Sequence, residues 1–218
     1  MVEREVITIP TLVHLMKVGD PGFDQENHEV ARSKAQLSTL FAGPDSPHFD
    51  QSANFIWRKA RVQFALEDTE VGHYRLSDLG LTERDIRTVG DQVPGQCNPH
   101  DERDRELFRM VQRKFGNKKF PGLQVFVWAR IGKGAGCAMS DPGENVDGAV
   151  WLEAFTLDTE EARERLTAHE IGHFFGLQHV PEGERPKRLM APNWEGSALT
   201  EHEIDKVHAR ARSVLQLK

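Results

Sequence analysis

The sequence contains few cysteines, no excess of positive charge and no long apolar run. Two cysteines in 218 residues are too few for a disulfide framework, although they could form one bridge. A formal net charge of −6 argues against nucleic acid or an anionic membrane surface as the main partner, because both attract a basic surface. No stretch approaches the roughly 20 consecutive apolar residues of a membrane-spanning helix. Solubility is the plainer consequence of the negative charge.

The composition is that of a globular protein, with 38% hydrophobic and 28% charged residues. The length suits one domain, and we expect a monomer. The opening segment, residues 1–19, interrupts its apolar residues with charged ones, so it does not resemble a secretory signal. We therefore expect a cytoplasmic protein, or one exported by a non-classical route, unless a leader has been removed. The compartment stays open.

Apolar patterns predict four strands. RVQFALE, at residues 61–67, alternates polar and apolar side chains, as a half-buried strand does, and LQVFVWARI, at 123–131, is the most hydrophobic candidate. We expect Pro10 to break the first strand, because proline lacks the N–H group that a strand ladder uses. The predicted strands cover residues 5–18, 61–67, 123–131 and 149–155.

Helical spacing and capping residues predict the helices. Thr200 can cap a helix together with Glu203, and Asp158 with Glu161 forms a similar capping pair. Residues 68–102 show no sustained periodicity, which predicts a long excursion containing one short helix; such length usually serves a function or covers the domain. The predicted helices cover residues 28–41, 51–59, 105–115, 200–215 and a segment that runs from 158 into the motif described next.

Residues 169–179 read HEIGHFFGLQH, with three histidines and one glutamate in eleven positions. On a helix, His169 and His173 project from one face, because positions i and i+4 differ by about 40° around the axis. Two imidazoles can then hold one cation. Glu170 lies about 100° round from His169, where a carboxylate can take a proton from a water molecule beside the metal.

His179 is the third histidine of this segment. A continuing helix would carry it about 240° round and about 9 Å along from His173, away from the metal. Gly176 can end the helix, because glycine adopts the left-handed conformation at little steric cost. His179 can then return as a third ligand and leave the fourth zinc position to water. Paired helical histidines alone are more often exposed or hydrogen-bonded to a neighbour, but the added glycine and histidine favour a zinc site.

The pattern HExxHxxGxxH resembles that of the metzincin clan of zinc peptidases, in which a methionine follows in a tight turn beneath the metal, the Met-turn. Met190 in RLMAP, eleven residues after His179, matches this methionine, with ordinary core filling as the alternative. Pro192 resembles the matrixin-like turn, whereas the early part of the chain looks broadly like pappalysin-like bacterial members, so the subfamily stays open. Position 192 is not tyrosine and Tyr74 is the only tyrosine of the chain, which excludes the tyrosine ligand of astacin-like and serralysin-like turns.

The resemblance, which covers about residues 134–210, implies an α+β fold. The expected parts are a twisted mixed sheet with an antiparallel edge strand, an active-site helix and a C-terminal helix. Residues 1–218 would form one catalytic domain, with an upper subdomain at 1–176 and a lower one, containing the Met-turn, at 177–218. The glycine-rich segment 134–139 would bind an extended peptide through main-chain hydrogen bonds, with a flexible loop as the alternative. The implied substrate contacts are Gly134, Ala135, Gly136, Pro192, Asn193 and Trp194.

The implied activity is that of a zinc endopeptidase acting on proteins or peptides. One catalytic Zn²⁺ would be held by His169, His173 and His179, with Glu170 as the general base. One alternative is a gluzincin-type hydrolase with Glu195 or Glu201 as the third ligand. Another is a zinc-stabilised protein that binds a partner without cleaving it.

Other polar residues have less specific interpretations. An acidic cluster in a turn-rich loop could hold a structural Ca²⁺, but we favour a solvated loop. The residues around Cys97 do not reproduce the matrixin cysteine switch, so a disulfide between Cys97 and Cys137, or two buried thiols, is preferred. The remaining histidines are scattered and are assigned no metal. The acidic cluster comprises Asp141, Glu144 and Asp147, and the scattered histidines are at positions 14, 28, 48, 73, 100, 202 and 208.

Overall fold

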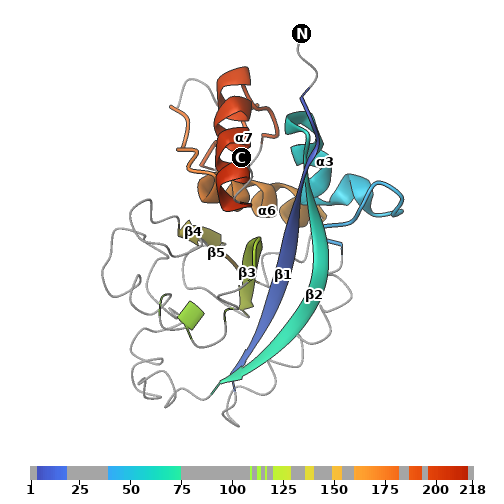
Figure 1. The fold of residues 1–218 in the computed structure, drawn as a ribbon, viewed down its shortest axis with the longest axis vertical. Coiled ribbons are helices and arrows are strands. Elements are labelled where there is room, and N and C mark those ends of the chain that lie inside the picture. Colours follow the sequence, from blue (N-terminus) through green and yellow to red (C-terminus); the bar gives the residue numbers. More distant parts are fainter. Residues whose placement is uncertain are drawn as a thin grey trace.

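The computed structural model of the protein describes residues 4–18, 39–74, 109, 112–113, 116, 120–128, 136–139, 149–153, 160–181, 187–192 and 196–215. These residues form a mixed α/β fold, in which three helices gather beside one end of two long strands (Figure 1). The helices are α3 (Ala53–Trp57), α6 (Glu160–Phe174) and α7 (Glu201–Val214), and the 3-10 turns η2 (Phe49–Gln51) and η3 (Arg58–Ala60) flank α3. No helix in this described part of the chain is long and apolar enough to cross a membrane.

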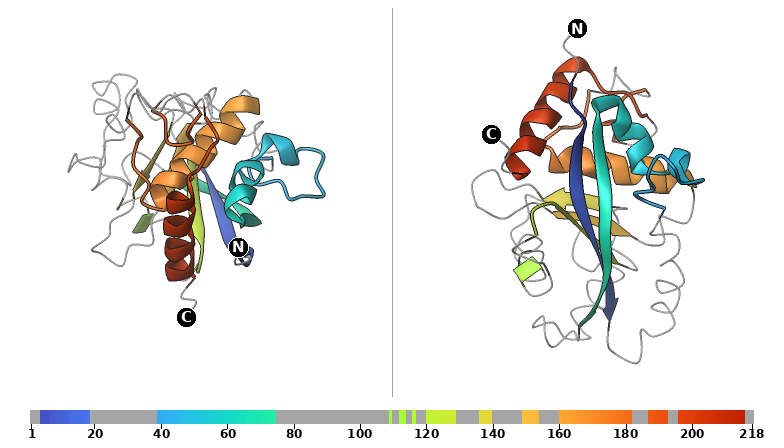
Figure 2. Two further views of the ribbon diagram at one scale, coloured as in Figure 1. Left: turned by 90° about the horizontal axis from the view of Figure 1, so that it is seen from above. Right: turned by 45° about the vertical axis from the view of Figure 1, so that its right-hand side comes forward.

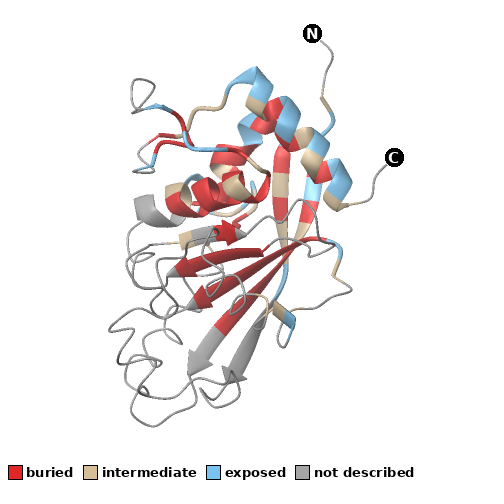
Figure 3. Ribbon diagram, turned by 90° about the vertical axis from the view of Figure 1, so that its left-hand side faces the viewer, coloured by how far each residue is buried: buried red, intermediate tan, exposed pale blue. Residues whose placement is uncertain are grey.

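Four parallel strands form the body of the sheet, in the order β2-β1-β3-β5, and β4 pairs antiparallel with β5 at the edge. Residues 123–127 of β3 and 149–152 of β5 are all buried (Figure 3), as is typical of parallel strands that are covered on both faces. The strands are β1 (Ile7–Val18), β2 (Val62–Tyr74), β3 (Leu123–Trp128), β4 (Gly136–Met139) and β5 (Ala149–Glu153).

The prediction that Pro10 breaks the first strand is wrong, because β1 runs without interruption from Ile7 to Val18. The Pro10 carbonyl oxygen lies so close to Gly122 that a Cβ there would clash with it. The nitrogen and carbonyl of one strand residue face the same side, so the missing N–H also points toward Gly122. The ladder between β1 and β3 begins only at Thr11, and no ladder hydrogen bond is therefore lost at Pro10.

The predicted excursion at 68–102 begins too early, because residues 68–74 continue β2 alongside β1. Their sequence, DTEVGHY, does not alternate cleanly, and the pairing passes an irregularity between Thr11 and Leu12. Residues 75–102 lie outside the described part of the chain. Most of the predicted helix at 28–41 also lies outside the described part, and its last residues, 39–41, form a turn. The same holds for most of the predicted helix at 105–115, of which residues 109 and 112–113 are described and are helical.

The core between the sheet and the helices centres on aromatic side chains. Trp57 of α3, Phe64 of β2 and Phe175, which directly follows α6, are all buried. The ring of Phe175 lies 5.3 Å from that of Trp57 and 6.2 Å from that of Phe64, centroid to centroid. Such pairs add about 0.5–1.5 kcal/mol each beyond the area they bury. They hold the C-terminal end of α6 against β2 and α3.

Helix α6 runs across the direction of β1 and β2 (Figure 2) and contacts β4 and β5. Its residues from 166 to 171 are all buried, so polar side chains in this part of the helix are enclosed by protein. Helix α7 is amphipathic and packs Ile204, Val207 and Ala211 inward. Its first turn has the predicted capping box between Thr200 and Glu203, which is thereby confirmed.

Candidate metal centre

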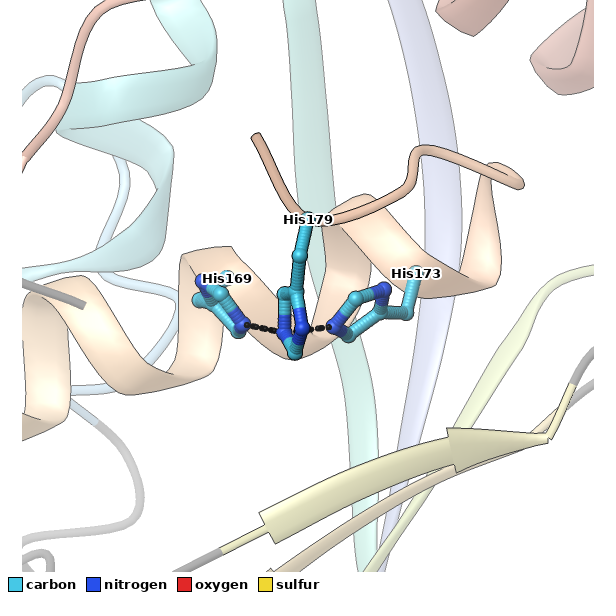
Figure 4. Close-up of side chains that lie close together, drawn as sticks. All are labelled: His169, His173 and His179. Carbon is cyan, nitrogen blue, oxygen red and sulfur yellow. Dashed lines mark hydrogen bonds between the residues drawn. The ribbon is translucent and has the colours of Figure 1, made fainter. Parts of the chain in front are cut away.

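Three histidine side chains converge at the C-terminal end of α6 (Figure 4). His169 and His173 project from the helix one turn apart, and His179 follows it. The Nε2 atom of His179 lies 3.2 Å from Nε2 of His169 and 3.0 Å from Nε2 of His173. One ligand atom from each residue lies within 4.8 Å of the others. These three side chains could therefore hold one metal ion.

Backbone carbonyls orient the two helical histidines. The Nδ1 atom of His169 lies 2.8 Å from the carbonyl oxygen of Leu189, and Nδ1 of His173 lies 2.9 Å from that of Leu177. A carbonyl oxygen only accepts hydrogen bonds, so each Nδ1 carries the proton and donates it. The neutral imidazole then presents the lone pair of Nε2 to the centre of the cluster. Partners of this kind commonly fix the tautomer and the ring direction of ligating histidines.

A helix-ending turn at Gly176 directs the chain toward His179. Gly176 has a φ of 81°, in the left-handed region that glycine adopts without strain. Its N–H donates to the carbonyl of His173 (2.8 Å), and the N–H of Leu177 donates to that of Gly172 (2.9 Å). This pair of hydrogen bonds is the Schellman motif. The carbonyl of Leu177 then bonds His173, so the turn that redirects the chain also orients a histidine.

The arrangement of donor atoms fits a tetrahedral metal ion. Nε2 of His169 and Nε2 of His173 both present lone pairs, so neither can donate a hydrogen bond to His179. Zinc–nitrogen bonds of about 2.0–2.1 Å in a tetrahedral site place the nitrogens roughly 3.3–3.4 Å apart. The observed separations of 3.0 and 3.2 Å are close to this value. Three imidazoles facing one point are a donor set that suits a transition-metal ion.

Burial keeps the helical imidazoles neutral. It lowers the pKa of His169 from 6.5 to about 4, with smaller contributions from His173 and His179, against the opposing effect of the Leu189 carbonyl. Burial also lowers the pKa of His173. Only the neutral imidazole has a free nitrogen for a metal. Both helical histidines are therefore in the metal-binding form at neutral pH.

Glu170 is a buried carboxyl group next to His169, with 6% of its surface exposed. Its Oε2 atom has no hydrogen-bond partner among the described residues, and burial raises its pKa from 4.5 to about 8. Strand β4 lies directly against it, because a Cβ on Gly136 would be only 2.9 Å from Cγ of Glu170. A buried carboxyl oxygen without a hydrogen-bond partner is costly, and carboxyl groups with a strongly shifted pKa concentrate at functional sites.

Met190 is fully buried, and its side chain lies against Gly172 of α6. A Cβ on Gly172 would clash with its Sδ atom and lie 3.2 Å from its Cε. The carbonyl of Met190 accepts from the N–H of Val180 at 3.0 Å, which ties the segment after His179 to the segment that carries Met190. The methionine thus contacts α6 between the two histidines that the helix supplies.

The structure places only some of the other predicted site residues. Gly136 lies in β4 against Glu170, and Pro192 is exposed. Glu201, an alternative third ligand, forms an ion pair with Arg4 at 2.9 Å, and its side chain is 79% exposed. Cys137 is in β4, whereas its proposed partner is not described. The predicted residues that lie outside the described part of the chain are Gly134, Ala135, Asn193, Trp194, Glu195, Cys97, Asp141, Glu144 and Asp147.

Several residues that support the centre were not predicted. Gly172 has a sequence signal that was available, since a glycine inside a helical pattern often marks a close approach. Lys206 and Glu203 of α7 and the Leu189 carbonyl have no such signal. The Leu189 carbonyl and Lys206 contact the histidine segment across 20 and 30 positions of sequence. Glu203 pairs with Arg188, the residue before Leu189. No local pattern reveals contacts of this kind.

No family model matches the chain, and no curated protein matches it. Among solved structures, it is similar to a chain in the structure of a chaperone–substrate complex, with a TM-score of 0.49 and 13% identity, covering 98% of this chain but 36% of that one. It is also similar to archaemetzincin from Methanopyrus kandleri, with a TM-score of 0.43 and 12% identity, covering 97% of this chain and 99% of that one. Scores and identities this low do not imply a shared function.

Proposed function

We propose that the protein is a zinc-dependent endopeptidase of the metzincin type. The observation that supports this best is the convergence of three Nε2 atoms, 3.0 and 3.2 Å apart along two sides, next to the buried carboxyl group of Glu170. Three histidines leave one position of a tetrahedral zinc site free, as catalytic zinc sites do and structural ones do not. The motif HExxHxxGxxH in residues 169–179 agrees with this proposal.

Zinc held by His169, His173 and His179 would polarise the scissile carbonyl and lower the pKa of a water molecule. Glu170 would accept the proton of that water and pass it to the leaving nitrogen. The pKa of about 8 describes the carboxyl group without a cation, and a cation nearby would lower it, because positive charge favours the carboxylate. Burial acts against this lowering, because it disfavours the charged carboxylate.

The other predicted parts complete this proposal. Met190, packed against Gly172, would be the methionine of the Met-turn. The segment from Ala191 to Ser197, including Trp194, would form the wall beside the scissile bond. Strand β4 pairs with β5 on one side only among the described residues. Its other edge would bind an extended substrate through main-chain hydrogen bonds. The catalytic domain would then comprise an upper part up to residue 176 and a lower part after it.

The test is cleavage of a mixture of unfolded proteins and peptides by the purified zinc-loaded chain, read by mass spectrometry. The matched control is Glu170→Gln, which keeps the shape of the side chain but cannot take up a proton, and a second control is the chelated wild type. We expect defined cuts from the wild type alone, with one zinc per chain in both proteins. Cuts of equal rate from Glu170→Gln would refute the mechanism, and a zinc-loaded wild type without cuts would favour a binding protein.

A further inference from the structure

We propose that Lys206 of α7 is a positioning residue of the metal centre and sets the place of the third histidine, His179. This inference rests on the metal-binding part of the proposed function and adds a residue from a different element to it. The Nζ atom of Lys206 donates to the carbonyl oxygen of Gly176 at 2.6 Å, across 30 positions of sequence. Gly176 is the turning point from which the chain returns to the cluster.

The contact fixes one peptide unit from both sides. The carbonyl of Gly176 and the N–H of Leu177 belong to the same planar peptide group. The N–H bonds the carbonyl of Gly172 in α6 at 2.9 Å, and the carbonyl bonds Lys206. A peptide unit held at both ends cannot rotate, so the direction in which the chain leaves toward His179 is set. The next carbonyl, that of Leu177, orients His173.

The charge of Lys206 also suits its position. The last carbonyls of α6 form the negative end of the helix dipole, where a cation is stabilising. The stem of the lysine lies over the turn, since a Cβ on Gly176 would be 3.7 Å from Cε of Lys206. A hydrogen bond from an ammonium group to a carbonyl is stronger than one between neutral groups.

Helix α7 also contacts the segment that orients His169, and this contact helps to hold Lys206 in place. Glu203, one turn earlier on α7, bonds Arg188 at 2.7 Å through one oxygen and the Thr200 N–H at 2.7 Å through the other. Arg188 immediately precedes Leu189, whose carbonyl orients His169. One helix thereby connects the segment behind His169 with the turn before His179.

The test compares metal binding by Lys206→Met, Lys206→Arg and the wild type. Methionine keeps the apolar stem but removes the donor, and arginine restores a charged donor. Zn²⁺ affinity is measured by competition with a chromophoric chelator, and the visible spectrum of the Co²⁺-loaded protein reports the coordination geometry. Loss of a supporting contact of this kind typically weakens metal binding 10–100-fold. Because Lys206 is exposed, we expect Lys206→Met to bind Zn²⁺ about tenfold more weakly and to have a changed Co²⁺ spectrum. Lys206→Arg should regain most of the Zn²⁺ affinity and a Co²⁺ spectrum close to that of the wild type.

Arg212→Met is the matched control, because it also removes a cation from α7. Arg212 pairs with Glu5, at 3.6 Å, and not with the turn before His179. The control variant should bind zinc as the wild type does. A Lys206→Met protein with wild-type affinity and Co²⁺ spectrum would overturn the inference, as would an equal loss in Arg212→Met. A wild type that binds metal without cleaving peptides would refute the peptidase alone, whereas a wild type that binds no metal would refute both proposals.

Discussion

Replacing Gly172 with alanine tests how closely Met190 packs against helix α6. The added Cβ would clash with Sδ of Met190, lie 3.2 Å from its Cε and lie 3.7 Å from Cδ1 of Leu177. Met190 is fully buried, so its side chain has little room to withdraw. The substitution therefore has two opposing effects on stability: it overpacks the core, and it places a better helix-forming residue in α6.

The two effects have known sizes. Overpacking a core costs about 1–3 kcal/mol, and alanine in place of glycine in a helix gains about 1 kcal/mol. We expect a net loss of about 0–2 kcal/mol in the free energy of unfolding. With Met190→Ala in the background the clash is gone, and Gly172→Ala should then stabilise the protein by about 1 kcal/mol. The sign of the effect should therefore reverse, with a coupling energy of about 1–3 kcal/mol.

The assay is urea unfolding of the metal-free wild type, both single variants and the double variant, with midpoints converted to free energies. Met190→Ala alone should cost about 2–5 kcal/mol, because it leaves a cavity. Ala209→Gly, on the exposed side of α7, calibrates the helix preference of alanine over glycine in this protein. A coupling energy below about 0.5 kcal/mol would show that Met190 does not support α6 in the way described.

Three further outcomes are expected. Without metal, Glu170 holds a proton in the folded state up to a pH of about 8 but only up to about 4.5 when unfolded. The wild type should therefore lose stability relative to Glu170→Gln as the pH rises from 4.5 to 8, by up to about 1.4 kcal/mol per pH unit; parallel urea curves would contradict this. Asn54→Ala removes four hydrogen bonds to the backbone of residues 41, 42 and 64. It should cost about 2–5 kcal/mol in denaturant unfolding, and a cost under about 1 kcal/mol would be contrary evidence. His179→Ala should weaken zinc binding at least about tenfold in a chelator competition, whereas Glu201→Ala should not; the reverse result would favour the gluzincin alternative.

Local patterns predicted most of the described elements. The apolar runs at 123–131 and 149–155 correspond to β3 and β5, the segment at 51–59 to α3 with its flanking turns, and the last helix to α7 with its capping box. Each depends on neighbours within a few residues. The two errors, a strand break at Pro10 and a loop at residues 68–74, arose because these positions depend on distant segments. The pairing of β1 with β2 and β3 keeps both segments in strands.

The sequence by itself determined the chemistry of the centre. The spacing of His169 and His173 follows from the pitch of one helix, and Gly176 is the residue that can end it at little steric cost. The tertiary structure decided how these groups are held and how they titrate. Strand β4 passes close enough to enclose Glu170, the Leu189 carbonyl orients His169, and Lys206 bonds the turn before His179. These contacts join segments far apart in the chain, and burial, which only the folded chain produces, shifts each pKa by removing water.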